Sequence, residues 1–253
     1  MDDLVNLLSV ARFSRRRIAN IPDDLMPADV DAAYQAQHAL TDHWANTLDG
    51  YGGYKIACTS EIPQRQLGTD GPFYGRLFQK TIHDSPAAID LSALFMCVIE
   101  PEFGFLLGSD LEARVHTQEE VAHAVAGVAP AIEIVDSRYN DWESVGLRSL
   151  IVDNACHGAW VNGPLTPHFG DLASHQVRLN VNGVEVSSGT GAAVLGHPLA
   201  ALTWLVNKLA LHGAHLCKGD WVTTGVVTGL YYAAPGDHIE ADFGTLGSVR
   251  IQF

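Results

Sequence analysis

Residues 97–107 read Cys-Val-Ile-Glu-Pro-Glu-Phe-Gly-Phe-Leu-Leu, an apolar stretch that is interrupted by Glu100 and Glu102. The β-branched and aromatic residues and the short length are typical of a buried strand. Because residues two apart in a strand point to the same face, both carboxylates are expected to project together, with Cβ atoms roughly 7 Å apart. The other face, with Phe103 and Phe105, is expected to belong to the core.

The two neighbouring carboxylates need a positive partner, because they repel each other and are costly to remove from water. Carboxylate oxygens are hard ligands that suit Mg²⁺, Mn²⁺ or Ca²⁺, so a divalent ion is a partner that fits. Taken alone, Glu100 and Glu102 are explained at least as well by a strand whose acidic side faces solvent.

A third acid, Glu133, interrupts the next short apolar strand, residues 129–136, in which Ile132 and Ile134 point the other way. A helix expected over residues 117–126 joins the two strands. Three carboxylates on consecutive strands can converge on one point and form a partial shell, which water and substrate complete to an octahedron. No Cys or His stands at zinc-ligand spacing, in agreement with a hard metal.

The overall composition is that of an ordinary soluble enzyme, with 253 residues, 47% hydrophobic and 17% charged. A net charge of -14 makes nucleic acid and anionic membranes poor partners, because both need clustered Lys and Arg. The basic residues 15–17 fit a solvated helix face. There is no signal peptide, no window approaching about 18 apolar residues, and four scattered cysteines that indicate reduced thiols, so a cytoplasmic location is expected.

The chain is expected to form an N-terminal helical subdomain over residues 1–52 and one catalytic domain over residues 53–253. No G-x-G-x-x-G follows an early strand and no regular βαβ array is present, which argues against a dinucleotide-binding fold. The expected elements are helices over 4–19, 30–48 and 198–213, a hairpin over 177–186 turning at Asn182-Gly183, and strands over 221–224, 230–233, 238–242 and 248–253.

Lys55 lies in a short apolar strand and is followed by the hydroxyls of Thr59 and Ser60. A cation in this position can receive an anionic group of a substrate. The Ser60 hydroxyl is also placed to cap a helix over residues 61–67, whose first amides would favour an anion. Alternatively, Lys55 extends to water and Ser60 serves only as a helix cap.

Three further positions leave two explanations open. Thr224 ends an apolar strand just before Gly225, which suits either a substrate contact or an ordinary turn. Arg138 follows Glu133 closely and either supports the acids or forms a salt bridge. His157 is either a base or a packed histidine.

Together these segments resemble the fumarylacetoacetate hydrolase superfamily, in particular its 2-keto-4-pentenoate hydratase and 4-oxalocrotonate decarboxylase branch. The likeness extends in order along nearly the whole chain. The matching segments are residues 54–60, 66–68, 74–75, 99–102, 133–138, 141–142, 153–155, 187–189, 195–199 and 234–237.

The resemblance implies an α+β fold with a mixed, largely antiparallel β-roll that is flanked by helices, the N-terminal helices forming an added layer, and a homo-oligomer. It implies that Glu100, Glu102 and Glu133 bind Mg²⁺ or Mn²⁺, with Lys55 and Glu133 in catalytic roles. The substrate contacts expected are Lys55, Thr59, Ser60, Arg138, Ser188 and Thr224.

The chemistry implied is enolisation of a small 2-oxo acid, most typically hydration of 2-hydroxypenta-2,4-dienoate to 4-hydroxy-2-oxopentanoate. Phe73 stands where hydratases of this branch usually carry an aspartate, and residues 226–229 replace a usual Gly-Pro pair. These departures keep two alternatives open: a C–C hydrolase or decarboxylase of a 2-oxo or acylpyruvate-type acid, and a non-catalytic protein that binds 2-oxo acids.

Overall fold

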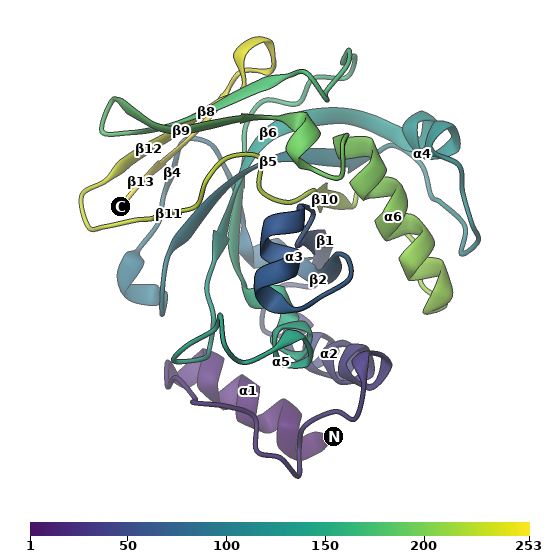
Figure 1. The fold of residues 1–253 in the computed structure, drawn as a ribbon, viewed down its shortest axis with the longest axis vertical. Helices are drawn as coiled ribbons and strands as arrows, with labels where there is room; N and C mark the ends of the chain where they lie inside the picture. Colours follow the sequence, from purple (N-terminus) through teal and green to yellow (C-terminus); the bar gives the residue numbers. More distant parts are fainter.

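Two β-sheets form the centre of the molecule, and the N-terminal helices cover one end of it (Figure 1). The structure, a computed structural model, describes residues 1–253 except for the side chains of Ile62 and Gln66. Both parallel and antiparallel strand pairs occur, and antiparallel pairs predominate. The expected mixed α+β fold is confirmed.

The larger, eight-stranded sheet has the order β2-β1-β10-β5-β6-β7-β3, with β11 paired to β5 outside this path. The pairs β1·β10 and β3·β7 are parallel. Its strands are β1 (Tyr51–Ala57), β2 (Phe73–Phe78), β3 (Ile82–Asp84), β5 (Val98–Leu107), β6 (Val125–Val135), β7 (His157–Asn162), β10 (Trp221–Thr223) and β11 (Tyr231–Tyr232).

The antiparallel pair β5·β6 is the centre of this sheet, and Glu100 lies directly opposite Glu133 in its register. Directly opposed residues of an antiparallel pair share a face, as do residues two apart in one strand. The helix α4 (Gln118–Ala124) joins the two strands and begins with a capping box between Thr117 and Glu120. The strand pairing therefore places Glu100, Glu102 and Glu133 on one face.

The smaller sheet has the order β4-β13-β12-β8-β9 and lies at the upper left of Figure 1. The predicted hairpin is confirmed, because Asn182 and Gly183 have φ values of 52° and 81°, as the tight turn between its strands requires. The strands are β4 (Ala87–Ala88), β8 (Gln176–Val181), β9 (Val184–Thr190), β12 (His238–Asp242) and β13 (Ser248–Gln252).

Of the two N-terminal helices, the second packs against α5 (Leu147–Val152) and the first packs against the second, and both share the hydrophobic core with α5. The helix α2 (Val30–Ala45) begins where predicted but ends three residues before the predicted end at Leu48. The Asp29 carboxylate caps it by accepting a hydrogen bond from the Ala32 amide at 2.8 Å. Trp44 is fully buried between α2 and the rest of the core. A domain boundary at residue 52 stays a prediction.

The first helix, α1 (Asp2–Ser14), ends five residues earlier than predicted. Arg15 adopts a left-handed conformation with φ of 53°, which stops the helix. The side chains of Arg15 and Arg17 then donate to the carbonyl oxygens of Leu94 and Phe95. The predicted helix end was therefore wrong. The partners of these arginines lie about 80 residues further along the chain, so the local sequence pattern does not reveal them.

The helix α6 (Pro198–Leu211) is rich in leucine and alanine. Among the described residues, the segment Gly191–Leu211 has the length and mean hydropathy, 1.2, that would allow membrane crossing. However, the 14 residues of α6 span only about 21 Å, less than the hydrocarbon core of a bilayer. Leu202, Leu205 and Leu209 are fully buried, so α6 is a core helix.

Candidate active site

The structure brings the three acids of the central strand pair together, as the strand pattern predicts. One carboxylate oxygen from each of Glu100, Glu102 and Glu133 lies within 4.8 Å of the others. Glu102 and Glu133 are fully buried, and Glu100 is half-buried. A solvent-facing acidic strand, the alternative explanation, does not describe this cluster.

The end of β10 fixes the orientation of Glu102. The Thr223 hydroxyl and the Gly225 amide both donate to Glu102 Oε2, the amide at 2.8 Å. Gly225 has φ of 98°, and a Cβ atom there would lie 2.0 Å from Thr59 Oγ1, so glycine is required. Among the described residues, Glu102 Oε1 has no hydrogen-bond partner, which leaves this oxygen free to bind a ligand.

Lys55 extends from β1 into the acid cluster and is only 2% exposed, so it does not extend to water. Its Nζ lies 3.1 Å from Glu133 Oε2 and donates to the Ala155 carbonyl at 2.7 Å. Ala155 is the middle one of three successive residues in the left-handed conformation, Asn154, Ala155 and Cys156, with φ of 53°, 51° and 57°. Such residues cost about 1–2 kcal/mol each, and here they shape the turn that carries the Lys55 acceptor.

His157 holds the other oxygen of Glu133. Its Nδ1 lies 3.2 Å from Glu133 Oε1, and its Nε2 lies 2.9 Å from the Thr81 hydroxyl. Burial, together with the nearby cations, lowers the pKa of His157 well below its ordinary value, so the imidazole is neutral. Sequence reasoning left the role of His157 open, because it contacts Glu133 through strand pairing rather than through a recognisable spacing.

The acid cluster carries more negative than positive charge. Burial raises the pKa of Glu100 and Glu133 to about 7, and it raises the pKa of Glu102 well above its ordinary value, with the neighbouring carboxylates adding to this. Burial opposes the charged form of Lys55, but the three carboxylates outweigh it and raise the pKa of the lysine. A hard divalent cation fits these residues, because it supplies the missing charge and suits their donor atoms.

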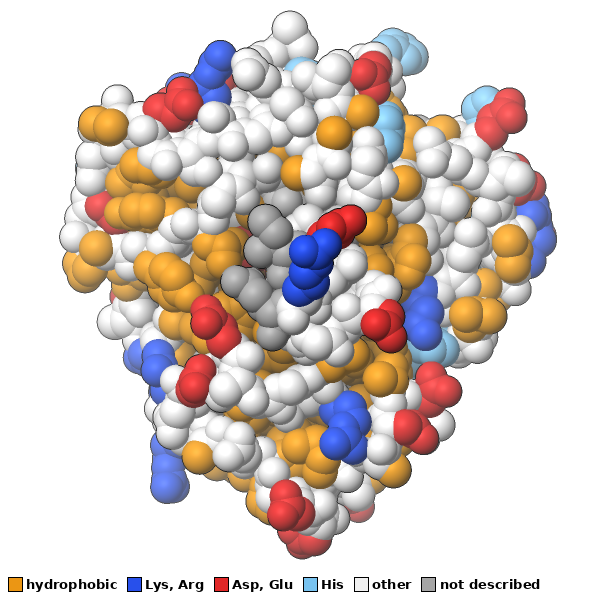
Figure 2. Space-filling model, viewed as in Figure 1, with side chains coloured by type: hydrophobic (Ala, Val, Ile, Leu, Met, Phe, Trp, Pro, Cys, Tyr) orange, Lys and Arg blue, Asp and Glu red, His pale blue; other side chains and the backbone are white. Residues whose placement is uncertain are grey.

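A cavity of about 600 Å³ opens beside Lys55 and Glu100. Strand β1, the helix α3 (Glu61–Leu67) and the loop after β10 contribute to its lining. On the face shown in Figure 2, hydrophobic side chains gather around the place where Figure 1 shows α3. The apolar side chains of the lining include Pro63, Leu67, Phe73, Val135, Trp142, Leu150, Val226 and Leu230.

Three of the predicted substrate contacts, Lys55, Thr59 and Ser60, line this cavity. The predicted helix cap is not formed, because the Ser60 side chain makes no capping hydrogen bond to α3. Phe73, which replaces the expected aspartate, begins β2 and also lines the cavity. Its aromatic ring offers no exchangeable proton at this place.

The other predicted contacts, Arg138, Ser188 and Thr224, are not among the residues that line this cavity. Arg138 is fully buried, and its guanidinium donates to Asp153 Oδ1 at 2.6 Å, so the salt-bridge explanation describes it. Thr224 is also buried and donates to the Phe103 carbonyl at 3.0 Å. Ser188 is exposed on β9.

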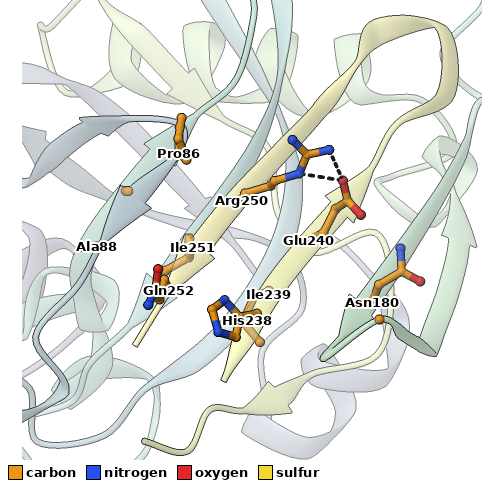
Figure 3. Close-up of a pocket in the computed structure, with 11 residues that line it drawn as sticks. Pro86, Ala88, Asn180, His238, Ile239, Glu240, Arg250, Ile251 and Gln252 are labelled. Atoms are coloured by element: carbon orange, nitrogen blue, oxygen red, sulfur yellow. Dashed lines mark hydrogen bonds and ion pairs between the residues drawn. The ribbon is translucent and has the colours of Figure 1, made fainter. Parts of the chain in front are cut away.

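A second hollow, of about 460 Å³, lies on the smaller sheet (Figure 3). None of the three acids lines it. Arg250 and Glu240, which do, form an ion pair with each other at 2.7 Å, so their charges are already matched. The acid cluster and its cavity are therefore the stronger candidate for an active site.

Comparison with known proteins identifies the family. Residues 73–253 match the sequence model of the fumarylacetoacetate hydrolase C-terminal domain. The chain belongs to this family. It is 36% identical over its whole length to a 2-keto-4-pentenoate hydratase of Paraburkholderia xenovorans, with 94% of that protein covered. It is 34% identical to a 2-hydroxyhexa-2,4-dienoate hydratase of Comamonas testosteroni, with 95% of this chain and 92% of that protein covered.

The fold is also similar to that of a solved structure. The 4-oxalocrotonate decarboxylase of Pseudomonas putida G7, complexed with magnesium and adipate, superposes with a TM-score of 0.93 at 30% identity, covering 99% of this chain and 96% of the other. A second structure of that enzyme contains calcium and acetate, with a TM-score of 0.91 and the same identity and coverage.

Proposed function

We propose that the protein is a metal-dependent lyase that hydrates 2-hydroxypenta-2,4-dienoate or a close homologue to the 4-hydroxy-2-oxo acid. The observation that carries the proposal is the buried three-carboxylate cluster beside a cavity, in a chain that is 36% identical to a 2-keto-4-pentenoate hydratase. We also propose a homo-oligomer, following the family resemblance, and a cytoplasmic location, following the scattered cysteines of the sequence.

Glu100, Glu102 and Glu133 would hold the ion, for which we propose Mg²⁺ or Mn²⁺. The free oxygen of Glu102 and the excess of carboxylates over cations support this assignment, and the related decarboxylase contains magnesium or calcium. When bound, such an ion would supply Lewis-acid stabilisation of negative charge on a 2-oxo acid.

Lys55 is placed to bind the carboxylate of the substrate. Its ammonium group has three donors, of which one is used for the hydrogen bond to the Ala155 carbonyl, while Glu133 Oε2 forms an ion pair with Nζ at 3.1 Å. A remaining donor would then be available for a substrate carboxylate in the cavity that Lys55 lines. In this arrangement Lys55 neutralises charge and orients the substrate.

Glu133 would hold or move a proton during enolisation, because it lies between Lys55 and His157 and both of its oxygens are positioned. In the overall reaction the enol proton leaves the substrate, protons reach C5 and C3, and the hydroxyl of water adds at C4. Since Phe73 cannot move protons, another group must serve the water in this chain.

Decarboxylation is the second candidate function. It is favoured by Phe73 in the cavity, in place of the aspartate expected of a hydratase, and by the similarity to 4-oxalocrotonate decarboxylase. Both reactions use the same kind of enolate, so the buried acids support either. The non-catalytic alternative has no observation of its own in its favour.

The test is to remove divalent ions from the purified protein with a chelator, add back Mg²⁺ or Mn²⁺, and measure turnover of the dienoate, of 4-oxalocrotonate and of an acylpyruvate. We expect loss of the dienoate with uptake of water, only when an ion is present. Undiminished turnover without ions would contradict the metal site, and release of CO₂ from 4-oxalocrotonate alone would favour the second candidate.

A further inference from the structure

We infer that Glu143 is the catalytic base that takes a proton from the water that adds to the substrate. This inference rests on the proposed function, because it takes the 2-oxo acid group to lie at the acid cluster and a hydration step to follow. Phe73 leaves the wall of the cavity without the acid that is expected there. A water that adds to C4 must therefore lose its proton to another group of the lining.

Among the side chains that the structure describes, Glu143 is the one carboxylate of the lining that lies outside the acid cluster. The other lining side chains with titratable or hydroxyl groups, apart from Glu100, are Lys55, Cys58, Thr59, Ser60, Cys156 and Thr228. The lysine is a cation, and hydroxyl groups are far weaker bases than a carboxylate. Burial raises the pKa of both thiols to about 12, so they stay protonated. Glu143 is therefore the group best suited to accept the proton.

A turn before α5 holds Glu143 at the cavity. Its neighbour Trp142 also lines the cavity and packs against the hydrophobic core, which anchors this part of the chain. The Ser144 hydroxyl donates to Asp141 Oδ2 at 2.8 Å and closes the turn around the two residues. The Glu143 side chain itself is exposed, so a proton that it accepts can pass to solvent.

Tyr232 connects Glu143 to the face of the sheet that carries the acids. It lies opposite Val98 in the pairing of β11 with β5, and Val98 lies two residues before Glu100. Opposed residues of an antiparallel pair share a face, as do residues two apart in one strand, so Tyr232 and Glu100 share a face. The Tyr232 hydroxyl donates to Glu143 Oε1 at 3.4 Å. Glu143 therefore lies on the side of the sheet where the carbon chain of a substrate bound at the acids would extend.

A carboxylate at this place can complete the addition of water. The water oxygen bonds to C4 of the 2-oxo-3-enoate form of the substrate, and one proton of the water passes to Glu143. The electron pair of the C3–C4 double bond moves toward the 2-oxo group and gives an enolate, which becomes the ketone again when C3 takes up a proton. Glu143 then returns its proton to solvent, so the net change is the addition of one water.

Tyr232 is a positioning residue in this step. A carboxylate has about four acceptor sites, so the Tyr232 hydroxyl can orient Glu143 without preventing its contact with a water. The hydrogen bond is long, and Tyr232 is 55% exposed, so its loss should cost less than the loss of the carboxylate.

Two assays on the full chain with excess Mg²⁺ separate the addition of water from enolisation. Hydration is measured by NMR as formation of 4-hydroxy-2-oxopentanoate from the dienoate. Enolisation alone is measured as exchange of the C3 protons of 2-oxopentanoate for deuterium, because this ligand has no double bond to hydrate. In Glu143→Gln we expect kcat for hydration to fall at least about 100-fold, while the exchange rate stays within about twofold.

Three further variants define the role of the carboxylate. Glu143→Asp keeps a carboxylate and should retain more hydration than Glu143→Gln. Tyr232→Phe keeps the ring and loses the donor, so we expect about a fivefold decrease in hydration. Glu119→Gln, at an exposed site of α4 outside the lining, removes the same charge and should leave both rates unchanged.

The outcomes separate the two proposals. Unchanged hydration in Glu143→Gln, an equal loss of hydration and exchange in that variant, or the same loss of hydration in Glu119→Gln would overturn the role of Glu143 while leaving the proposed function intact. If the original protein forms no hydration product from the dienoate, the proposed function fails, and the role of Glu143 fails with it.

Discussion

At the scale of single residues, the site depends on how each carboxylate is held. Glu102 is fixed through one oxygen by Thr223 and the Gly225 amide, while no described residue forms a hydrogen bond to its other oxygen. Glu133 is held on both sides, by Lys55 and by His157. These contacts orient the carboxylates toward one place before any ligand binds, so binding would not cost the conformational entropy of ordering them.

Replacing Lys55 with methionine should lower kcat/KM for the dienoate at least about 100-fold, because the side chain keeps its length but loses the cation that faces the substrate carboxylate. Steady-state kinetics with Mg²⁺ measure this. Lys55→Arg, which keeps the charge, should retain more activity than Lys55→Met. Equal activity in both variants and the original protein would exclude a role of Lys55 in turnover.

His157→Leu should weaken Mn²⁺ binding about 10- to 100-fold, because Glu133 Oε1 loses the partner that orients it. Calorimetric titration with Mn²⁺ measures the change. Thr81→Val, which removes only the hydroxyl behind His157, serves as the matched variant and should have a smaller effect. Unchanged Mn²⁺ affinity in His157→Leu would show that His157 is only packed in the core.

At the scale of elements, strand pairing creates the acid cluster and the end of β10 completes it. The two acids of β5 and the single acid of β6 share a face because of the register, and α4 is short enough to keep the strands adjacent. The strand end at residues 223–225 comes from a segment more than 100 residues away, and β10 pairs with β5.

Gly225→Ala should reduce the free energy of unfolding by about 1–3 kcal/mol, because its Cβ would meet Thr59 Oγ1 at 2.0 Å and its φ of 98° is unfavourable for alanine. Urea denaturation followed by circular dichroism measures the loss. Gly146→Ala, where φ is 80° but no atom lies within 4 Å, isolates the cost of the backbone conformation alone. Equal losses in the two variants would show that the contact with Thr59 contributes nothing.

Many of the helices and strands could be predicted from the sequence, because the residue patterns that define them are local. Alternation along residues 97–107 and 129–136 indicated that the three acids can converge, and the family resemblance selected them as one ligand set. The roles of His157 and Gly225 could not be predicted, because they depend on contacts between distant segments. The end of α1 at Ser14 and the uncapped Ser60 were missed for the same reason: local patterns do not include tertiary partners.

At the scale of the whole molecule, one hydrophobic core extends from the N-terminal helices into the sheets and surrounds the acids. This burial is what makes the acid cluster costly without a counterion. The α+β architecture and the family could be predicted because the matching segments occur in order along the chain. The residues that line the cavity could not be predicted, because they come from helices, strands and loops in both halves of the sequence.

The stability of the metal-free protein should fall as pH rises from about 4.5 to about 7. Glu100 and Glu133 have ordinary pKa values near 4.5 and folded-state pKa values of about 7, so in this window the folded state binds more protons than the unfolded chain. Added Mg²⁺ should oppose the trend, because it binds the deprotonated acids. Melting temperatures at pH 5 to 8, with and without Mg²⁺, measure the pH dependence and the stabilisation by the ion. A stabilisation by Mg²⁺ that is largest at pH 5 would contradict the prediction.

The most direct test of the central claim is calorimetric titration of the metal-free protein with Mn²⁺, compared with Glu102→Gln. The substitution keeps the shape of the side chain and removes one charge from the cluster. We predict one Mn²⁺ site per chain in the original protein, with affinity reduced at least about 100-fold in Glu102→Gln. Absence of binding, or equal affinity in the two proteins, would contradict the claim that the three carboxylates hold one divalent ion.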